Sequence, residues 1–221
     1  MAAVSASDDA SGRVRIAILA KAPLPGLAKT RLAPRLGEAG AACLQRWLLQ
    51  RAVATAVVAD TGPVALWCAP DTQHPEFHLC RAFGPVSLHR QPEADLGARM
   101  LAALSQPPVQ PTLVIGTDSP ALTPELLRQA AGALLGGDDA VVLPAEDGGY
   151  VLIGLRQASA APFDGVAWGG PRVMAQTRER FAAAGWRWRE PATLWDVDRP
   201  EDFDRLAALY PDVLDWLREA A

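Results

Sequence analysis

The sequence predicts a three-layer α/β fold, in which a mixed, mostly parallel β-sheet carries helices on both faces. Short apolar runs alternate with longer segments of helical periodicity along the chain, a pattern typical of such sheets. Hydrophobic residues make up 50% of the 221 residues, which is enough for a substantial core. Charged motifs follow several of the apolar runs, and parallel sheets bind their ligands beyond these carboxyl ends of the strands.

In the first half of the chain, strands are expected where short apolar runs are bounded by turn residues, and helices where apolar residues recur at helical spacing. The expected strands are residues 14–20, 64–69 and 86–90, and the expected helices are residues 38–60 and 95–104. Gly62-Pro63 ends the first of these helices, and Pro107-Pro108 ends the second. Residues 70–85 are loop-like, with room for a short helix around Glu76.

The second half repeats this alternation, and Thr123-Pro124-Glu125 is its clearest helix start. Threonine is a good cap, proline suits the first turn, and an acid is favourable near the positive end of the helix. The expected strands are residues 112–116, 140–143 and 151–155, with further extended segments at 186–189 and 194–197. The expected helices are residues 123–135, 171–184, 200–209 and 213–220.

Composition narrows the class of protein. A net charge of -4 argues against a nucleic-acid surface, and no apolar run approaches the roughly 20 residues of a membrane span. The three cysteines form no disulfide framework, so we expect a reducing compartment and a cytoplasmic protein. Zinc binding by His74, His78 and Cys80 is disfavoured, because no CxxC motif supports it. Residues 1–12 are expected to be a disordered tail, and residues 13–221 a single catalytic domain.

A cationic loop follows the first expected strand. It contains Lys21 and Lys29, the only lysines of the chain, together with Arg31. Prolines stiffen the loop, and Gly26 lets the backbone take conformations that other residues avoid. A strand-to-helix loop is the usual phosphate-binding position in α/β proteins, so this loop predicts a phosphate site rather than a merely solvated basic loop.

Carboxylates follow two other strands. Asp118 ends the strand over residues 112–116, where it is poorly solvated unless a cation compensates it. Mg²⁺ or Mn²⁺ is suitable, since such ions use a few carboxylates together with substrate phosphates. The alternative is that Asp118 only accepts hydrogen bonds within its turn. Asp196 and Asp198 share one face of an extended segment, although Asp198 is also placed to cap the helix that begins at Pro200.

A glycine-rich turn completes the candidate site. Gly148 and Gly149 permit close approach of a ligand, Asp147 is placed to orient or deprotonate a hydroxyl group, and Tyr150 is placed to stack on a sugar or base. The same residues also predict an ordinary β-hairpin, which the spacing alone favours. Arg99 is a further candidate phosphate contact, with a solvated helix arginine as the alternative.

Taken together, these motifs resemble those of a bacterial family of glycosyltransferase-A-type proteins labelled arsenosugar-biosynthesis glycosyltransferase. The resemblance runs from about Arg13 to Leu209. Its motifs are Ala20-Lys21-Ala22-Pro23, Gly26, Lys29-Thr30-Arg31-Leu32, Asp95-Leu96-Gly97, Arg99-Met100, Gly116-Thr117-Asp118-Ser119-Pro120, Pro144-Ala145-Glu146-Asp147-Gly148-Gly149-Tyr150, Trp168, Asp196-Val197-Asp198 and Asp202. The chain is more distantly similar to phospholactate guanylyltransferase and molybdenum-cofactor guanylyltransferase.

The resemblance implies the Rossmann-like fold of the nucleotide-diphospho-sugar transferases, known as GT-A. It implies that four cations face the nucleotide phosphates: Lys21, Lys29, Arg31 and Arg99. It also implies that Asp118 holds Mg²⁺ or Mn²⁺, with Asp198 as the second ligand, although the spacing of the residues leaves Asp196 as an alternative to Asp198. One departure from the family pattern is Gly169-Gly170 after Trp168, where the family tends to have Ser-Thr.

The expected function is metal-dependent transfer of a sugar from a nucleotide sugar to a small hydroxyl acceptor, with Asp118 and Asp147 as catalytic residues. One alternative is nucleotidyl transfer, which joins an NTP to a phosphorylated small molecule. A phosphate nucleophile is already an anion and needs no base, so the presence of Asp147 favours glycosyl transfer. The other alternative is a non-catalytic nucleotide-binding protein. It does not explain the set of acidic residues, because binding phosphate alone requires cations and few carboxylates.

Overall fold

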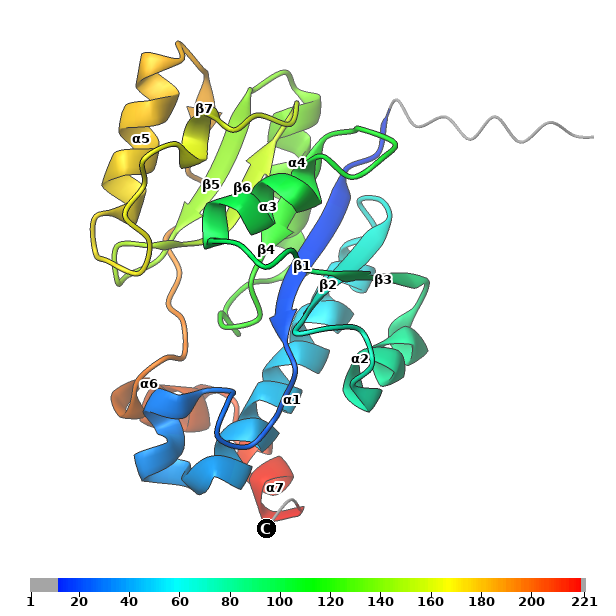
Figure 1. Cartoon of the computed structure of the whole chain (residues 1–221), viewed down its shortest axis with the longest axis vertical. Coiled ribbons are helices and arrows are strands. Elements are labelled where there is room, and N and C mark those ends of the chain that lie inside the picture. The colour runs from blue at the N-terminus through cyan, green and yellow to red at the C-terminus, as the bar shows by residue number, and fades with distance from the viewer. Residues whose placement is uncertain (1–11, 220–221) are drawn as a thin grey trace, which may run out of the picture.

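A computed structural model describes residues 12–219, so the expected tail over residues 1–12 lies outside the described residues except for Gly12. Within them, seven strands form one sheet in the order β3-β2-β1-β4-β6-β5-β7 (Figure 1). The strands are β1 (Arg15–Lys21), β2 (Val64–Ala69), β3 (Val86–Arg90), β4 (Thr112–Ile115), β5 (Ala140–Pro144), β6 (Tyr150–Leu155) and β7 (Trp188–Arg189). Only β6 is antiparallel to its neighbours, β4 and β5, which confirms the predicted mixed, mostly parallel sheet.

Helices cover both faces of the sheet, as Figure 1 shows. Alternate residues of β1 point to opposite faces. Ile16 packs in one core cluster with residues of α1 (Ala33–Ala59) and α4 (Pro124–Leu135). Ala17 packs in a second cluster with residues of α3 (Leu96–Leu104) and α5 (Val173–Ala183). The remaining helices are α2 (Pro75–Leu79), α6 (Pro200–Leu209) and α7 (Asp212–Glu219), with short 3-10 turns at Thr30–Leu32, Cys80–Phe83 and Ala161–Phe163.

Two predicted elements differ from the structure. The first helix was expected from residue 38, but helical structure already begins at Ala33, and Gly37 interrupts it with a φ of 71°. Residues 194–197 were expected to be a strand, yet they make only one isolated bridge, between Leu194 and Ala145. The segment that leads from β7 to α6 therefore crosses the carboxyl ends of the strands instead of joining the sheet.

The C-terminal helices are fixed to α1 by a third core cluster. Trp47 and Leu48 of α1 pack there against Phe203 of α6. The Arg51 guanidinium lies 4.2 Å from the ring centroid of Tyr210, and both side chains donate hydrogen bonds to the Pro120 carbonyl, at 3.1 and 3.2 Å. These contacts hold the loop after β4 against the C-terminal helices.

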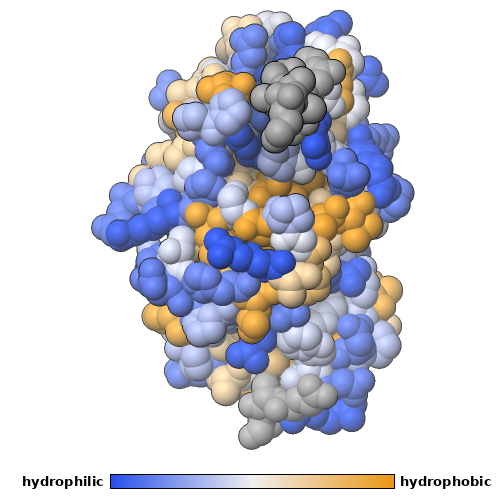
Figure 2. Space-filling view, turned by 90° about the vertical axis from the view of Figure 1, so that its right-hand side faces the viewer, coloured by the Kyte–Doolittle hydropathy of each residue, from blue (hydrophilic) through white to orange (hydrophobic). Residues whose placement is uncertain are grey.

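One edge of the sheet is β3, which lies with α2 at one side of the molecule. Figure 2 shows hydrophobic residues gathered across the middle of this side, between two more hydrophilic ends. Leu79 of α2 and Phe83 of the following 3-10 turn are exposed large apolar side chains. None of the helices within residues 12–219 has the length and apolar character needed to cross a bilayer.

Candidate functional site

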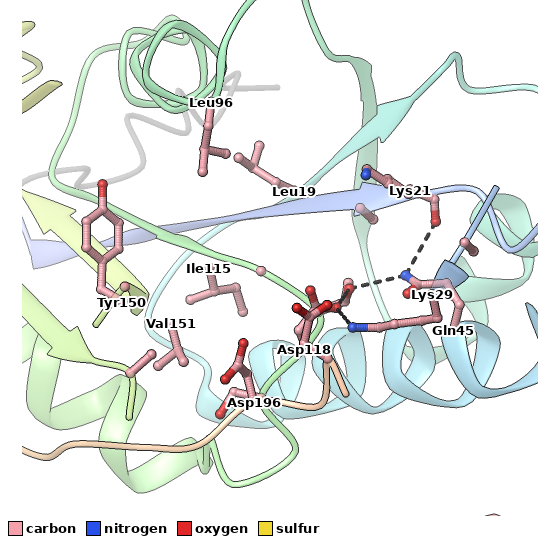
Figure 3. A pocket seen from close by; sticks show the side chains of 18 of the residues that line it. Leu19, Lys21, Lys29, Gln45, Leu96, Ile115, Asp118, Tyr150, Val151 and Asp196 are labelled. Atoms are coloured by element: carbon pink, nitrogen blue, oxygen red, sulfur yellow. Dashed lines mark hydrogen bonds and ion pairs between the residues drawn. The ribbon is translucent and has the colours of Figure 1, made fainter. Parts of the chain in front are cut away.

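A cavity of about 560 Å³ lies at the carboxyl ends of β1 and β4. These are the strands at which the chain order of the sheet reverses, the position where open α/β sheets bind their ligands. Figure 3 shows side chains from both strands, from α3 and from the crossing segment directed into this space. The topology therefore brings together motifs that are far apart in the sequence.

Most of the predicted site residues line the cavity. They are Lys21, Lys29, Arg31, Arg99, Asp118, Asp147, Gly149, Tyr150 and Asp198. Two predicted residues do not line it. Gly26 occupies an exposed turn with a φ of 74°, where a Cβ atom would lie 3.3 Å from the Glu38 carboxylate. Gly148 lies in the turn between β5 and β6 and is not a lining residue of the cavity.

Lys29 and Asp118 form the central ion pair of the site. The Lys29 Nζ atom lies 2.7 Å from Asp118 Oδ1 and donates a 2.6 Å hydrogen bond to the Val197 carbonyl. The Lys29 side chain is only 5% exposed, whereas that of Asp118 is 48% exposed. Burial opposes ionisation of Asp118, but the charge and hydrogen bond of Lys29 and a hydrogen bond from Thr117 hold the pKa of this carboxyl below its usual value. The compensating cation that the sequence required is thus present within the chain.

A second ion pair joins Arg31 to Asp198. Asp198 does not cap α6, contrary to the alternative drawn from its position. The N-cap residue is Arg199, and the Asp202 carboxylate accepts backbone hydrogen bonds from Asp198 and Arg199 at 3.0 and 2.7 Å. Among the described residues, Lys21 has no ion-pair partner, although its ammonium group belongs to the same loop. Lys21 is therefore the loop cation that is most open to a ligand.

Asp196 enters the cavity without an ion-pair or hydrogen-bond partner among residues 12–219. Burial, together with the nearby negative charges of Asp147 and Asp118, raises the pKa of Asp196 to about 6. Within the described part of the chain, no three His, Cys, Asp or Glu side chains are grouped to hold a metal ion by themselves. Mg²⁺ commonly uses one or two carboxylates together with substrate phosphates, and this donor set fits that mode.

The turn that contains Asp147 is a β-hairpin, as its spacing predicts, and it also borders the cavity. Asp147 Oδ1 accepts a 2.9 Å hydrogen bond from the Gly149 backbone, while its exposed carboxylate remains at the cavity rim. Gly148 has a φ of 92°, and a Cβ atom there would lie 2.1 Å from the Pro171 carbonyl. Only glycine permits this close approach, which fixes the hairpin against the segment before α5.

Tyr150 and Arg99, the remaining two predicted ligand contacts, both contact other residues of the protein. The Tyr150 hydroxyl lies 3.7 Å from Met100 Sδ, and burial raises the pKa of Tyr150. In Figure 3 its ring points away from Asp118 and Asp196. Arg99 donates through Nε to the Ala94 carbonyl at 2.7 Å, which leaves the other nitrogen atoms of its guanidinium for a ligand.

Two buried glutamines of the cavity carry no motif that identifies them in the sequence. Gln45 of α1 donates to Thr117 Oγ1 at 3.2 Å and so supports the residue before Asp118. Gln91 follows β3 and reaches across the ends of β2 and β1. Only the strand order brings these side chains to the site.

One protein-family model matches the central part of the chain. The model of a family described as uncharacterized proteins conserved in bacteria (DUF2064) matches residues 52–170. These residues include β2, β3, β4 and the β5–β6 hairpin. None of the curated proteins matches the chain significantly.

Solved structures resemble the whole chain. One is a protein from Desulfovibrio desulfuricans G20, proposed to be a nucleotide-diphospho-sugar transferase, with 27% identity, a TM-score of 0.77 and coverage of 94% of this chain and 97% of that one. A nucleotidyl transferase from Methanothermobacter has 15% identity and a TM-score of 0.60, covering 91% and 99%. A 4-diphosphocytidyl-2C-methyl-D-erythritol synthase from Anaerococcus prevotii has 13% identity and a TM-score of 0.59, covering 90% and 97%. The latter two similarities establish the shared fold.

Proposed function

Because the chain belongs to the DUF2064 family and has the α/β fold of the nucleotide-diphospho-sugar transferases, we propose that it is a metal-dependent glycosyltransferase. It moves a sugar from a nucleotide donor to a hydroxyl group of a small acceptor. The observation that carries this proposal is the arrangement of the cavity, in which loop cations lie near the end of β1 and Asp147 lies on the rim. Residues 13–221 act as one catalytic unit, and the activity belongs in the cytoplasm.

The cations bind the diphosphate of the donor. Lys21 and Arg99 have free hydrogen-bond donors that face the cavity, while Lys29 and Arg31 already neutralise Asp118 and Asp198. This arrangement of the four cations suits a dianionic ligand. The two open cations bind the phosphate oxygens, and the two paired cations neutralise the carboxylates, which would otherwise repel the phosphates.

Asp118 and one aspartate of the crossing segment would hold Mg²⁺ or Mn²⁺. Asp196 suits this role better than Asp198, because Asp198 is engaged by Arg31 whereas Asp196 has no ion pair with the described residues. When bound, such an ion supplies positive charge that stabilises the departing diphosphate. Negative charge at Asp147 and Asp118 already disfavours ionisation of Asp196, and a cation would relieve that repulsion.

Asp147 acts as the general base toward the acceptor. Its carboxylate removes the proton of the acceptor hydroxyl as that oxygen forms a bond to the sugar carbon. The bond from this carbon to the diphosphate breaks, and the diphosphate leaves with the electron pair. The hydrogen bond from Gly149 and the Gly148–Pro171 contact fix the position of the base.

Nucleotidyl transfer is the second candidate function, since one of the similar structures is a nucleotidyl transferase. A phosphate nucleophile gives Asp147 no proton to remove, and for this reason we favour glycosyl transfer. The motif resemblance to the family labelled arsenosugar-biosynthesis glycosyltransferase supports the same choice, with the acceptor taken as a small hydroxyl compound.

Product analysis tests the proposal. The protein is incubated with a panel of nucleotide sugars, Mg²⁺ or Mn²⁺, and water or small polyols as acceptor, and release of nucleoside diphosphate is measured. Asp147→Asn should slow release by roughly 10²–10⁴-fold with little effect on donor binding. Glu146→Gln is the matched control, because Glu146 is in the same turn but pairs with Arg205 outside the cavity. Pyrophosphate release from an NTP and a phosphorylated co-substrate, with no diphosphate from any sugar donor, would contradict the proposal.

A further inference from the structure

The two lysines of the cationic loop lie in different surroundings. Lys21 is exposed and has no ion-pair partner among residues 12–219, whereas the Lys29 side chain is only 5% exposed. The backbone of Lys29 has left-handed angles, with a φ of 49° and a ψ of 40°, which are unfavourable for a residue with a Cβ atom. Figure 3 shows the Lys29 side chain running to Asp118, while the Lys21 ammonium group lies apart from this pair. The two lysines are therefore suited to different tasks.

The Lys29 ammonium group joins two segments that carry candidate metal ligands. It donates a 2.6 Å hydrogen bond to the Val197 carbonyl and lies 2.7 Å from Asp118 Oδ1. The two segments are also bonded to each other directly. The Val197 N–H donates to the Asp118 carbonyl at 2.8 Å, and the Ser119 hydroxyl donates to the Trp195 carbonyl at 2.8 Å. Lys29 thus fixes the point at which the crossing segment meets the loop after β4.

This point also sets the position of Asp196. The Val197 side chain is fully buried in the third core cluster, together with Leu32, whereas the adjacent Asp196 lines the cavity. Figure 3 shows Asp196 near Asp118. Burial is the main cause of the raised pKa of Asp196; the negative charge of Asp118 also raises this pKa, and the positive charge of Lys29 lowers it. Lys29 therefore offsets the repulsion between the two carboxylates that it holds together.

The Lys29 contact leaves one oxygen of Asp118 for a ligand. Both side-chain contacts of Asp118 with the described residues are made by Oδ1, which accepts a hydrogen bond from Thr117 Oγ1 at 3.0 Å and pairs with Lys29. The Asp118 side chain is 48% exposed and lines the cavity, so Oδ2 is open there. A cation can reach this oxygen without displacing the Lys29 ammonium group.

We propose that Lys29 is a positioning residue, which holds Asp118 and the crossing segment together for a divalent metal ion, and that it does not bind the donor phosphates. The inference rests on the proposed function and departs from the role that the motif resemblance implies for Lys29. Two of the three ammonium hydrogens are used within the protein, and turning them to a phosphate would leave Asp118 and the Val197 carbonyl without this partner. Lys21 has no such partners and remains the phosphate ligand.

Calorimetry separates positioning from a simple effect of charge. Dissociation constants of UDP, GDP, CDP and ADP are measured with Mn²⁺ and with EDTA, and the diphosphate that the wild-type protein binds most tightly is used for the variants. Mn²⁺ should tighten binding about tenfold or more in the wild-type protein and about twofold or less in Lys29→Met. Loss of a neighbouring positive charge alone would strengthen the attraction of Asp118 for Mn²⁺. A metal response in Lys29→Met as large as that of the wild-type protein, or larger, would therefore overturn the inference.

A second comparison tests whether Lys29 binds phosphate. It is made with EDTA in an Asp118→Asn background, where Lys29→Met leaves no unpaired carboxylate to repel the ligand. Addition of Lys29→Met should change the dissociation constant less than about twofold. Lys21→Met is the matched change, and it should raise the dissociation constant about tenfold, as expected for a lost hydrogen bond to a charged group. A tenfold loss of affinity on addition of Lys29→Met would overturn the inference.

The control for loss of a charged side chain is Arg35→Met. Arg35 pairs with Asp204 outside the cavity, so this variant should keep the wild-type metal response. If Lys29→Met alone does not fold, the comparison in the Asp118→Asn background, where no carboxylate loses its cation, still decides whether Lys29 binds phosphate. Absence of binding by every diphosphate to the wild-type protein would reject the proposed function and this inference together, whereas the outcomes named for Lys29→Met reject the inference alone.

Discussion

Replacement of Lys29 by methionine should destabilise the ligand-free protein by about 2 kcal/mol. At 2.7 Å and an effective dielectric constant of about 20, the Lys29–Asp118 attraction is about 6 kcal/mol. Desolvation of the buried lysine and screening at the half-exposed aspartate offset most of it. The expected loss therefore lies between the roughly 0–1 kcal/mol of exposed pairs and the roughly 3–5 kcal/mol of broken buried pairs.

The assay is urea denaturation of a double-mutant cycle with Lys29→Met, Asp118→Asn and the double variant. A coupling energy of about 1.5–2 kcal/mol between the two positions is expected, since each change removes the same contact. Arg35→Met is the control, because the Arg35–Asp204 pair is 2.8 Å long with side chains that are 54% and 67% exposed. The reasoning is refuted if Lys29→Met costs no more than Arg35→Met, or if the coupling is below about 0.5 kcal/mol.

Three further outcomes are expected. Gly148→Ala should cost about 3 kcal/mol or more in thermal denaturation, because its Cβ atom meets the Pro171 carbonyl, while Gly132→Ala in open space on α4 should be neutral or stabilising by up to about 1 kcal/mol. The pKa of Asp196 is raised to about 6 from 3.8, so ionisation of this carboxyl lowers the free energy of unfolding. The loss is complete above about pH 6 and absent below about pH 4, where the carboxyl is protonated in both the folded and the unfolded state. Asp196→Asn should accordingly stabilise the ligand-free protein by about 1–2 kcal/mol at pH 7.5, and a gain that persists at pH 3.5 would contradict this cause. Chelation by EDTA should lower the melting temperature of the nucleotide-bound protein, and Asp118→Asn should abolish that response; an unchanged response would leave Asp118 without a metal role.

The strands that build the site were predictable because buried parallel strands are continuous apolar runs. β1 and β4 fall within one or two residues of their predicted bounds, and the charged motifs that follow them meet at one edge of the sheet. Thr123 was also predictable, since its side chain caps α4 with a bond from the Leu126 backbone at 3.3 Å. Local sequence determines each of these features.

Pairing across the cavity was not predictable, because it depends on the path of the chain. Asp196 and Asp198 share a face only if their segment is a regular strand, and that segment makes a single bridge to the sheet. Asp198 consequently pairs with Arg31, while Asp196 stays in the cavity. Gln91 is an isolated glutamine after a short strand, and only the neighbouring positions of β3, β2 and β1 give it its hydrogen bonds to the Ala20 and Trp67 carbonyls.

A crystal structure of the protein with a nucleoside diphosphate and Mn²⁺ tests the central claim most directly. The diphosphate should lie within hydrogen-bond distance of Lys21 and Arg99, with anomalous manganese density beside Asp118. Diphosphate density outside this cavity, for example in the hollow between Gln129 and Arg189, would contradict the account, as would manganese bound away from the carboxylates of the crossing segment and Asp118.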